Sequence, residues 1–288
     1  MTQPEISFEF FPPQTLEASF RLWDTVQTLA PLAPRFVSVT YGAGGTTREL
    51  TRDAAATLHK SSGLKVAAHL TCVDASRSET LAIADSFAAA GVTDIVALRG
   101  DPPKGQERFV PHPDGFAHSV ELIAALAETG SFTIRVGAYP DIHPEAPHAQ
   151  ADIDWLKAKL DAGADEALTQ FFFEAETFLR FRDACAKAGI DKPIVPGILP
   201  IENWAGAKKF AKRCGAQVPD WVDQAFDKAI RDNRHDLLAT ALCTELCSDL
   251  IDEGVDKLHF YTLNRPELTR DVCFALGITP KADLQNVA

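Results

Sequence analysis

The stretch RSETLAIADSFAAAGVTDIVALRGD, residues 77–101, shows how this chain is built. Residues 77–90 carry apolar side chains at helical spacing, and Gly91 follows where a helix commonly ends in a left-handed residue. Residues 94–99 form a short apolar run of the kind found in a buried strand of a parallel sheet. The stretch therefore predicts a helix that leads through a glycine turn into a strand.

The same join recurs along the chain, as Ala-Ala-Gly-Val at 89–92, Asp-Ala-Gly-Ala at 161–164, Lys-Ala-Gly-Ile at 187–190 and Asp-Glu-Gly-Val at 252–255. Eight strands are predicted, at residues 7–11, 36–41, 66–71, 94–99, 133–139, 167–172, 193–198 and 257–263. Helices are predicted at 16–30, 48–61, 77–90, 117–129, 153–162, 175–188, 204–214 and, after an insertion, 234–253. This alternation favours an α/β protein with a closed (β/α)8 TIM barrel over a doubly wound sheet. We expect residues 1–288 to form a single barrel domain.

The composition is that of a folded globular protein, with 46% hydrophobic and 24% charged residues. A formal net charge of -12 would repel nucleic-acid phosphates and anionic membranes. The six cysteines show no Cys-x-x-Cys pair and no disulfide-like spacing. No signal-peptide pattern follows Met1, and no apolar run is long enough to span a bilayer. We therefore expect a cytoplasmic protein with a small-molecule substrate and no nucleic-acid or membrane partner.

Barrel enzymes carry their reactive groups at the carboxyl ends of the strands, which draws attention to Glu9. It lies between Phe8 and Phe10, so strand alternation turns it away from both and toward one interior face. Burial in apolar surroundings is expected to raise the pKa of its carboxyl and make it a usable general acid. An interior glutamate neutralised by Arg or Lys is an equally good interpretation.

Other polar residues near the strand ends also have two interpretations. Arg99 and Asp101 flank Gly100, which would let a bound molecule approach the backbone, but a buried Arg–Asp ion pair is the competing interpretation. The amide of Gln170 suits the mixed edge of a heterocycle, although such amides are more often bonded to the backbone. Phe210, in a helical segment, would by default be a core residue.

Histidine clusters and glycine-rich stretches are the usual signatures of metal and nucleotide sites. His69 is more often a hydrogen-bonded core histidine than a ligand, and the histidines form no tight cluster with acids, so no metal is expected. Residues 42–47, Gly-Ala-Gly-Gly-Thr-Thr, could bind an anion, yet Thr47 as an ordinary N-cap explains them nearly as well. Because no Gly-x-Gly-x-x-Gly fingerprint occurs, any dinucleotide would be held by barrel loops.

Eight motifs, in order along nearly the whole chain, closely resemble those of bacterial methylenetetrahydrofolate reductases. They are Phe-Glu-Phe-Phe-Pro-Pro at 8–13, Phe-Val-Ser-Val-Thr-Tyr-Gly at 36–42, His-Leu-Thr-Cys at 69–72, Ala-Leu-Arg-Gly-Asp at 97–101, Tyr-Pro with His-Pro-Glu within 139–145, Thr-Gln-Phe-Phe at 169–172, Pro-Gly-Ile-Leu-Pro at 196–200 and Phe-Tyr-Thr-Leu-Asn-Arg at 260–265. The resemblance implies a (β/α)8 barrel that binds FAD noncovalently, with NADH or NADPH as co-substrate and 5,10-methylenetetrahydrofolate as substrate. We also expect a homo-oligomer.

The resemblance further implies roles for individual residues. Glu9 matches the general acid of the family, and Asp101 matches the acidic residue near the flavin and the pterin. The substrate positions are matched by Gln170, Phe210, Tyr261 and Arg265. The positions that contact FAD are matched by Thr40, His69, Leu98, Arg99, Gly100, Asp101, Ala117, Ala138, Tyr139, His143, Asp152 and Lys159. Trp155 and Ala158 depart from the pattern, which leads us to expect Asn and Arg there.

The implied reaction is a ping-pong transfer of hydride. NADH or NADPH reduces FAD and leaves, the folate takes its place, and Glu9 protonates an amine nitrogen as the folate ring opens to an iminium ion that accepts the hydride. The departures at Trp155 and Ala158 motivate an alternative, a flavin-free reductase that passes hydride directly from NADH to the folate. A second alternative is a folate-binding protein without catalytic activity.

Overall fold

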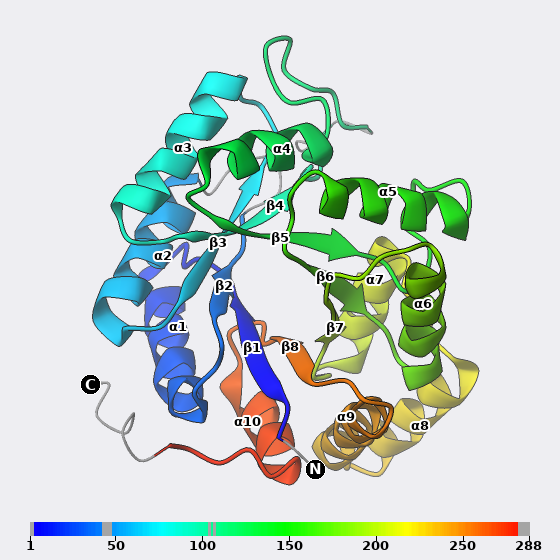
Figure 1. Cartoon of the computed structure of the whole chain (residues 1–288). Helices are drawn as coiled ribbons and strands as arrows, with labels where there is room; N and C mark the ends of the chain where they lie inside the picture. The colour runs from blue at the N-terminus through cyan, green and yellow to red at the C-terminus, as the bar shows by residue number, and fades with distance from the viewer. Residues whose placement is uncertain (1–2, 42–47, 103–104, 106–107, 282–288) are drawn as a thin grey trace.

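The computed structural model describes residues 3–41, 48–102, 105 and 108–281. Eight parallel strands close into a barrel whose order follows the chain, as Figure 1 shows. The strands are β1 (Glu5–Phe10), β2 (Val37–Val39), β3 (Val66–Thr71), β4 (Asp94–Leu98), β5 (Thr133–Ala138), β6 (Glu166–Phe171), β7 (Ile194–Ile198) and β8 (Lys257–Tyr261). Each overlaps a predicted strand, and the predicted barrel is confirmed.

The described residues form ten α-helices and one short 3-10 helix, η1 (Ala30–Leu32). The α-helices are α1 (Leu16–Leu29), α2 (Arg48–Ser62), α3 (Arg77–Ala89), α4 (Ser119–Thr129), α5 (Ala149–Asp161), α6 (Ala175–Lys187), α7 (Trp204–Cys214), α8 (Asp220–Arg231), α9 (His235–Asp252) and α10 (Pro266–Ala275). All eight predicted helices are present. None of the helices described is long and apolar enough to cross a membrane.

The sequence did not predict α8 and α10. The helix α10 completes the eighth β/α unit, whereas α8 and α9 are additional helices between β7 and β8. Pro266 occupies the first turn of α10, where its missing N–H costs nothing. The helix α5 begins earlier than predicted, because the His148 side chain accepts a hydrogen bond from the Ala151 N–H and caps it.

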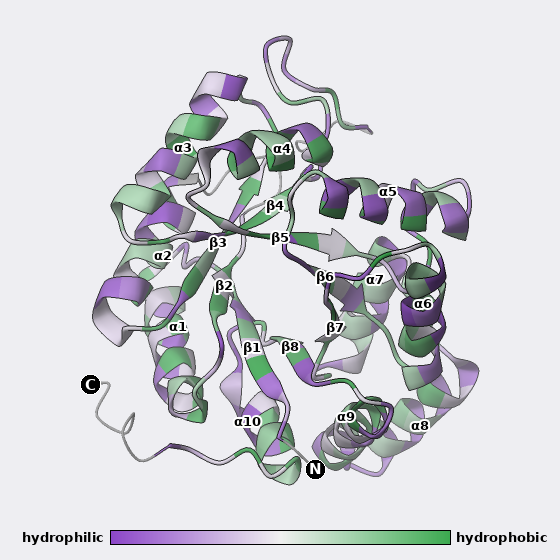
Figure 2. Ribbon diagram, in the orientation of Figure 1, coloured by the Kyte–Doolittle hydropathy of each residue, from purple (hydrophilic) through white to green (hydrophobic). Residues whose placement is uncertain are grey.

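The repeated glycine joins adopt the conformation expected of them. Gly91, Gly163, Gly189 and Gly254 have φ values of 82°, 120°, 78° and 86°, in the left-handed region that favours glycine. Figure 2 shows hydrophobic and hydrophilic residues distributed around the helices that enclose the barrel. All six cysteines are free, and Cys243 and Cys247 are both buried on α9.

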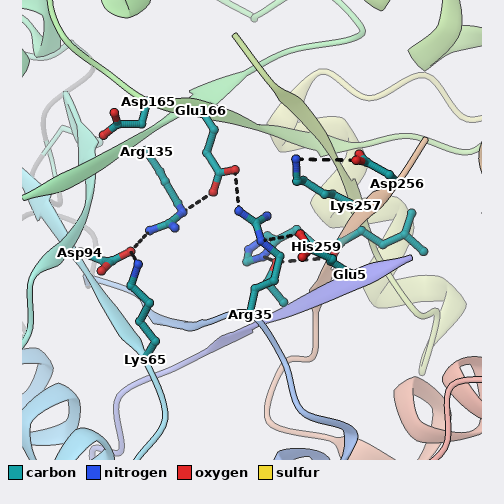
Figure 3. A network of polar contacts seen from close by, with 12 residues as sticks. Glu5, Arg35, Lys65, Asp94, Arg135, Asp165, Glu166, Asp256, Lys257 and His259 are labelled. Carbon is teal, nitrogen blue, oxygen red and sulfur yellow. Dashed lines mark hydrogen bonds and ion pairs between the residues drawn. The ribbon is translucent and has the colours of Figure 1, made fainter. Parts of the chain in front are cut away.

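The inside of the barrel is arranged in layers. A small apolar cluster fills the middle and consists of Phe36, Ala67, Val96, Leu168 and Val195. Below it, at the amino ends of the strands, lies a network of charged side chains that we call the basal ion network: Glu5, Arg35, Lys65, Asp94, Arg135 and Glu166 (Figure 3). Oppositely charged partners therefore close the lower mouth, and the strands' carboxyl ends are left for a site.

Candidate active site

The predicted site residues meet at the carboxyl ends of the strands because one position on each strand lies at the same level. Glu9 pairs in register with Ser38 on β2 and with Tyr261 on β8. Residues two apart on a strand face the same side, so the interior positions can be followed around the barrel. The interior residues toward the carboxyl ends include Glu9, Thr40, His69, Leu98, Tyr139, Gln170 and Tyr261, and Thr71, the register partner of Leu98, lies one interior position above His69.

Glu9 lies between two histidines. Its Oε2 atom is 3.3 Å from His69 Nε2 and 3.9 Å from His259 Nε2. Burial raises the pKa of Glu9, but its contacts with His259 and His69 outweigh burial and lower the pKa to about 2. The predicted rise in the pKa of Glu9 is therefore wrong for the protein without ligands, because two imidazole rings as well as apolar groups surround its carboxyl. Among the described residues, the charged partners of Glu9 are these two histidines and not an Arg or Lys.

His259 was not recognised in the sequence as a site residue. It is fully buried, and burial lowers its pKa more than the neighbouring Glu9 carboxylate raises it. At neutral pH the carboxylate of Glu9 therefore faces a neutral imidazole. The signal that could have revealed His259 is its place on β8, two residues before Tyr261 and on the same interior face.

The end of β1 is held in place by the loop after β8. The Asn264 amide accepts a hydrogen bond from Phe11 N–H at 2.9 Å and donates one to the Phe11 carbonyl at 3.0 Å. The Thr262 hydroxyl donates to the Glu9 carbonyl at 2.7 Å. These contacts join residues at opposite ends of the chain, and they fix the backbone that carries Glu9. This role of Asn264 was not predicted from the sequence.

A pocket of about 540 Å³ opens beside this site, between the ends of β3, β4 and β5 and the helices α4 and α5. Ten of the residues predicted to contact FAD line it: Leu98, Arg99, Gly100, Asp101, Ala117, Ala138, Tyr139, His143, Asp152 and Lys159. Thr40 and His69 do not line it, whereas their neighbours Tyr41 and Thr71 do. The anion loop suggested at 42–47 lies outside the described residues.

Cationic side chains project into this pocket. The Lys159 side chain is buried and its Nζ donates to the Gly137 carbonyl, and burial lowers the pKa of Lys159 to about 8. The Arg99 guanidinium binds both oxygens of Glu145, one of them at 3.0 Å, and lies over the Phe109 ring. Arg99 therefore pairs with Glu145 and not with Asp101, the partner suggested by the competing interpretation. Glu145 was not predicted from the sequence.

Gly100 is required by the wall of this pocket. Its φ is 87°, and a Cβ atom there would lie 2.5 Å from Val73 Cγ2 and 2.9 Å from Thr71 Cβ. The next loop is fixed by a hydrogen bond of 2.6 Å from His143 N–H to Asp152 Oδ2. Any larger residue at position 100 would therefore distort the strand end that presents Arg99 and Asp101.

The residues predicted to bind substrate lie outside the 540 Å³ pocket, on the β6 to β8 side of the barrel. Gln170 Oε1 accepts a hydrogen bond from the Phe171 N–H at 3.0 Å, so part of its amide is bonded to the backbone. The Phe210 ring on α7 packs 5.0 Å from the Phe171 ring. The Tyr261 hydroxyl donates to the Thr169 carbonyl at 2.6 Å. Exposed Arg265 occupies the N-cap position of α10, where its side chain makes no capping hydrogen bond.

The two departures from the family pattern lie on α5. Trp155 is 43% exposed, lines the 540 Å³ pocket, and meets the His118 ring edge-on at a centroid distance of 5.2 Å. Ala158 is half-buried and does not line the pocket. The outer end of the pocket is therefore aromatic.

A second cavity, of about 570 Å³, lies among the ends of β6 and β7 and the helices α6, α8 and α9, and none of the predicted site residues lines it. Within the described part of the chain, no group of three or more His, Cys, Asp or Glu side chains is arranged to hold a metal ion.

An interior acid at the upper mouth of a (β/α)8 barrel, beside a pocket lined by polar and charged side chains, is the arrangement of a barrel protein with a small-molecule site next to a proton-exchanging group. The sequence model of the methylenetetrahydrofolate reductase family matches residues 1–277. The 5,10-methylenetetrahydrofolate reductase of Pectobacterium carotovorum subsp. carotovorum is 45% identical over 276 residues, which cover 96% of this chain and 91% of the relative. That of Escherichia coli K12 is 45% identical over 279 residues, covering 96% and 92%. The chain belongs to the methylenetetrahydrofolate reductase family, and hence to the oxidoreductases.

A solved structure has the same overall arrangement. An uncharacterized protein from Clostridium thermocellum that binds two copies of 5-methyl-5,6,7,8-tetrahydrofolic acid superposes with a TM-score of 0.60, covering 96% of this chain and 95% of that one. The two sequences are 14% identical. At that identity, the likeness supports the barrel fold alone.

Proposed function

We propose that this protein reduces 5,10-methylenetetrahydrofolate to 5-methyltetrahydrofolate at the expense of NADH or NADPH, with FAD as the hydride carrier and residues 1–288 as one catalytic domain. Membership of the family supports the folate reaction. The observation that carries the mechanism is the placement of Glu9 at the upper end of β1, next to a pocket with buried and half-buried cations. A homo-oligomer is part of the proposal.

The residues lining the 540 Å³ pocket fit a flavin dinucleotide. Arg99, Lys159 and His143 would face its two phosphates, and Gly137, where a Cβ atom would meet only Leu98 Cδ2 at 3.7 Å, leaves room for close approach to the backbone. The size is in the range of roughly 300–1,000 Å³ that is usual for cofactor sites. Bound FAD would supply reversible hydride chemistry, which no protein side chain can provide.

The side chains would then divide the remaining work. NADH or NADPH and the folate would use the same space in turn, between Phe210 and the barrel mouth. Gln170 would present its amide NH2 to the pterin, and Asp101 would stabilise the positive charge of the iminium ion. Glu9 would donate a proton to the amine nitrogen that leaves as the ring opens.

The low pKa of Glu9 sets a condition on that last step. A carboxyl with a pKa of about 2 is ionised at neutral pH, so Glu9 must gain a proton as the complex forms. Burial is the largest influence on Glu9 and it favours the neutral acid. Flat ligands stacked over the barrel mouth would exclude more water and strengthen this influence, which supports an acid that is loaded only in the complex.

Replacing Glu9 by Gln tests the proposal. The Glu9→Gln protein should still bind FAD and reduce it with NADH, whereas the folate half-reaction should slow by about 10²–10⁴-fold. Rapid mixing with absorbance of the flavin would follow both half-reactions separately. Glu5→Gln is the matched control, because Glu5 lies on the same strand at the opposite mouth. Equal losses in both half-reactions would contradict the assignment of Glu9.

A second candidate is a flavin-free reductase, which Trp155 and Ala158 favour because they replace polar residues expected near the cofactor. Here hydride would pass directly from NADH to the folate. The absorption spectrum of the purified protein distinguishes the two, since a yellow protein with an oxidised-flavin band supports the first and a colourless, active protein supports the second. A protein that binds the folate without turning it over would indicate the third, non-catalytic function.

A further inference from the structure

The second cavity, of about 570 Å³, is used by none of the steps proposed above. Its inner wall is apolar and is formed by Phe171, Phe172 and Phe173 at the end of β6 and by Leu199 and Ile201 after β7. The helices α6, α8 and α9 enclose it on one side of the barrel (Figure 1). Its volume lies in the range of roughly 300–1,000 Å³ that is usual for small-molecule sites.

The rim of this cavity is acidic. Glu174 and Glu176 lie at the start of α6, and Glu245 and Asp249 lie one turn apart on α9. All four side chains are exposed, and none of them takes part in an ion pair with another described residue. The described residues that line the cavity include no Lys, Arg or His. Because the adjoining apolar wall concentrates the field of these carboxylates, the cavity favours a cation over a neutral molecule or an anion.

An aromatic ring lies among these acids. Trp221, in the first turn of α8, lines the cavity and is 48% exposed. Its indole N–H donates to Glu174 Oε1 at 2.8 Å, which holds the ring beside the carboxylates. The face of an indole ring attracts an ammonium group, and here the negative charges at the rim act in the same direction. The ring and the acids therefore select the same kind of ligand.

The wall behind Trp221 is already packed before any ligand binds. The Trp204 ring stacks on Phe226 at 4.5 Å with an interplanar angle of 12°, and Phe173 meets Trp204 edge-on at 5.9 Å. The Trp204 indole N–H donates to Asp223 Oδ1 at 2.8 Å, which ties α7 to α8. A ligand would therefore enter a formed cavity and would not have to order its walls.

The second cavity is separate from the 540 Å³ pocket, since the two have no lining residue in common. Phe171 is the wall on the side of the predicted folate site, and its ring packs 5.0 Å from that of Phe210. The two cavities also differ in charge, because Arg99 and Lys159 line the first and only acids are charged in the lining of the second. One is suited to phosphates and the other is not.

We propose that the second cavity is a binding site for a small organic cation, in which an ammonium group is carried on an aryl or alkyl body. The body lies against Phe172 and Leu199, and the ammonium group lies at the rim between Trp221 and the carboxylates of Glu245 and Asp249. The site is distinct from that of the folate, and it does not depend on the reaction proposed above.

Three probes of similar size and different charge test this preference: 4-phenylbutylammonium, 4-phenylbutanol and 4-phenylbutyrate. The chain has four tryptophans, so 5-fluorotryptophan can replace them and ¹⁹F nuclear magnetic resonance can follow each ring. The Trp221 signal is assigned by its loss in Trp221→Phe. We expect the ammonium to shift this signal with an affinity about tenfold higher than that of the alcohol, and the carboxylate to bind most weakly.

A pair of double variants locates the preference. In Glu245→Gln/Asp249→Asn, the ratio of the ammonium affinity to the alcohol affinity should fall from about tenfold to about twofold, while the alcohol binds as before. Asp85→Asn/Glu128→Gln is the matched control, because it removes two exposed acids from α3 and α4 and leaves the same net charge. Its affinity ratio should equal that of the unmodified protein. Unchanged binding of the alcohol shows that the cavity remains folded.

Several results would overturn the proposal. They are equal affinities for the ammonium and the alcohol, no shift of the Trp221 signal at the solubility limit of the ammonium, and a preference that persists in Glu245→Gln/Asp249→Asn. Displacement of the ammonium by 5-methyltetrahydrofolate would also overturn it, because the cavity would then be part of the folate site. Failure of the protein to reduce the folate would refute the proposed function and leave this site standing, since none of these measurements uses turnover.

Discussion

The two mouths of this barrel contain charged side chains of the same kinds but arrange them in opposite ways. At the lower mouth, Arg135 lies between Asp94 and Glu166, and further ion pairs extend the network on both sides. At the upper mouth, the Glu9 carboxylate faces two imidazoles whose Nε2 atoms lack hydrogen bonds among the described residues. Paired charges stabilise one conformation, whereas an unsatisfied cluster can exchange protons and accept a ligand. The difference favours the upper mouth as the candidate active site.

The largest effect is expected from breaking the lower mouth. Arg135→Met leaves Asp94 and Glu166 each with one fewer cationic partner in a buried site, which should reduce the free energy of unfolding by about 3 kcal/mol. Urea denaturation would measure it, with Lys157→Met as the control. Lys157 pairs with Asp161 on the exposed face of α5, at 2.9 Å, and its loss should cost less than about 1 kcal/mol. Equal losses in both variants would show that the basal ion network is not a structural element.

A smaller, pH-dependent effect is expected at the upper mouth. Burial lowers the pKa of Lys159 to about 8, so this side chain becomes neutral as the pH rises through 8. A bound diphosphate favours the charged form, and FAD binding above that pH must therefore take up a proton. The affinity for FAD should fall as the pH rises above 8, by up to about tenfold per pH unit. Flavin fluorescence titrations from neutral to alkaline pH would measure it, and Lys159→Met should remove the dependence.

The smallest effect is expected at the aromatic end of the pocket. Trp155→Ala removes the exposed ring that lines the pocket beside His118, and should weaken FAD binding by about 2–10-fold if the adenine ring packs there. Trp221→Ala is the matched control, because Trp221 is 48% exposed and lines the other cavity. Tighter binding of FAD to Trp155→Ala would indicate instead that this ring obstructs the flavin, in agreement with the flavin-free alternative.

Much of the fold could be predicted because its signals are local. The order of helix, glycine and strand seen in residues 77–101 recurs along the chain. This repetition predicts a barrel, and the structure confirms it. The helix α8 was missed because it lies in the insertion between β7 and β8, and α10 was missed because it follows the last predicted strand, although Pro266 marks its first turn. The candidate site was found in outline, since strand alternation alone places Glu9, Gln170 and Tyr261 on the inner face. Their assigned roles remain predictions.

The sequence by itself determined which side chains occupy the upper layer of the barrel, because period-two alternation and the order of the strands are properties of the chain. Only the tertiary structure decided their chemistry. Barrel closure brings β8 next to β1, so that His259 meets Ser7 and Glu9, and Asn264 reaches Phe11 from the other end of the chain. A pKa depends on which groups lie within a few ångströms in space, and no local pattern contains that information.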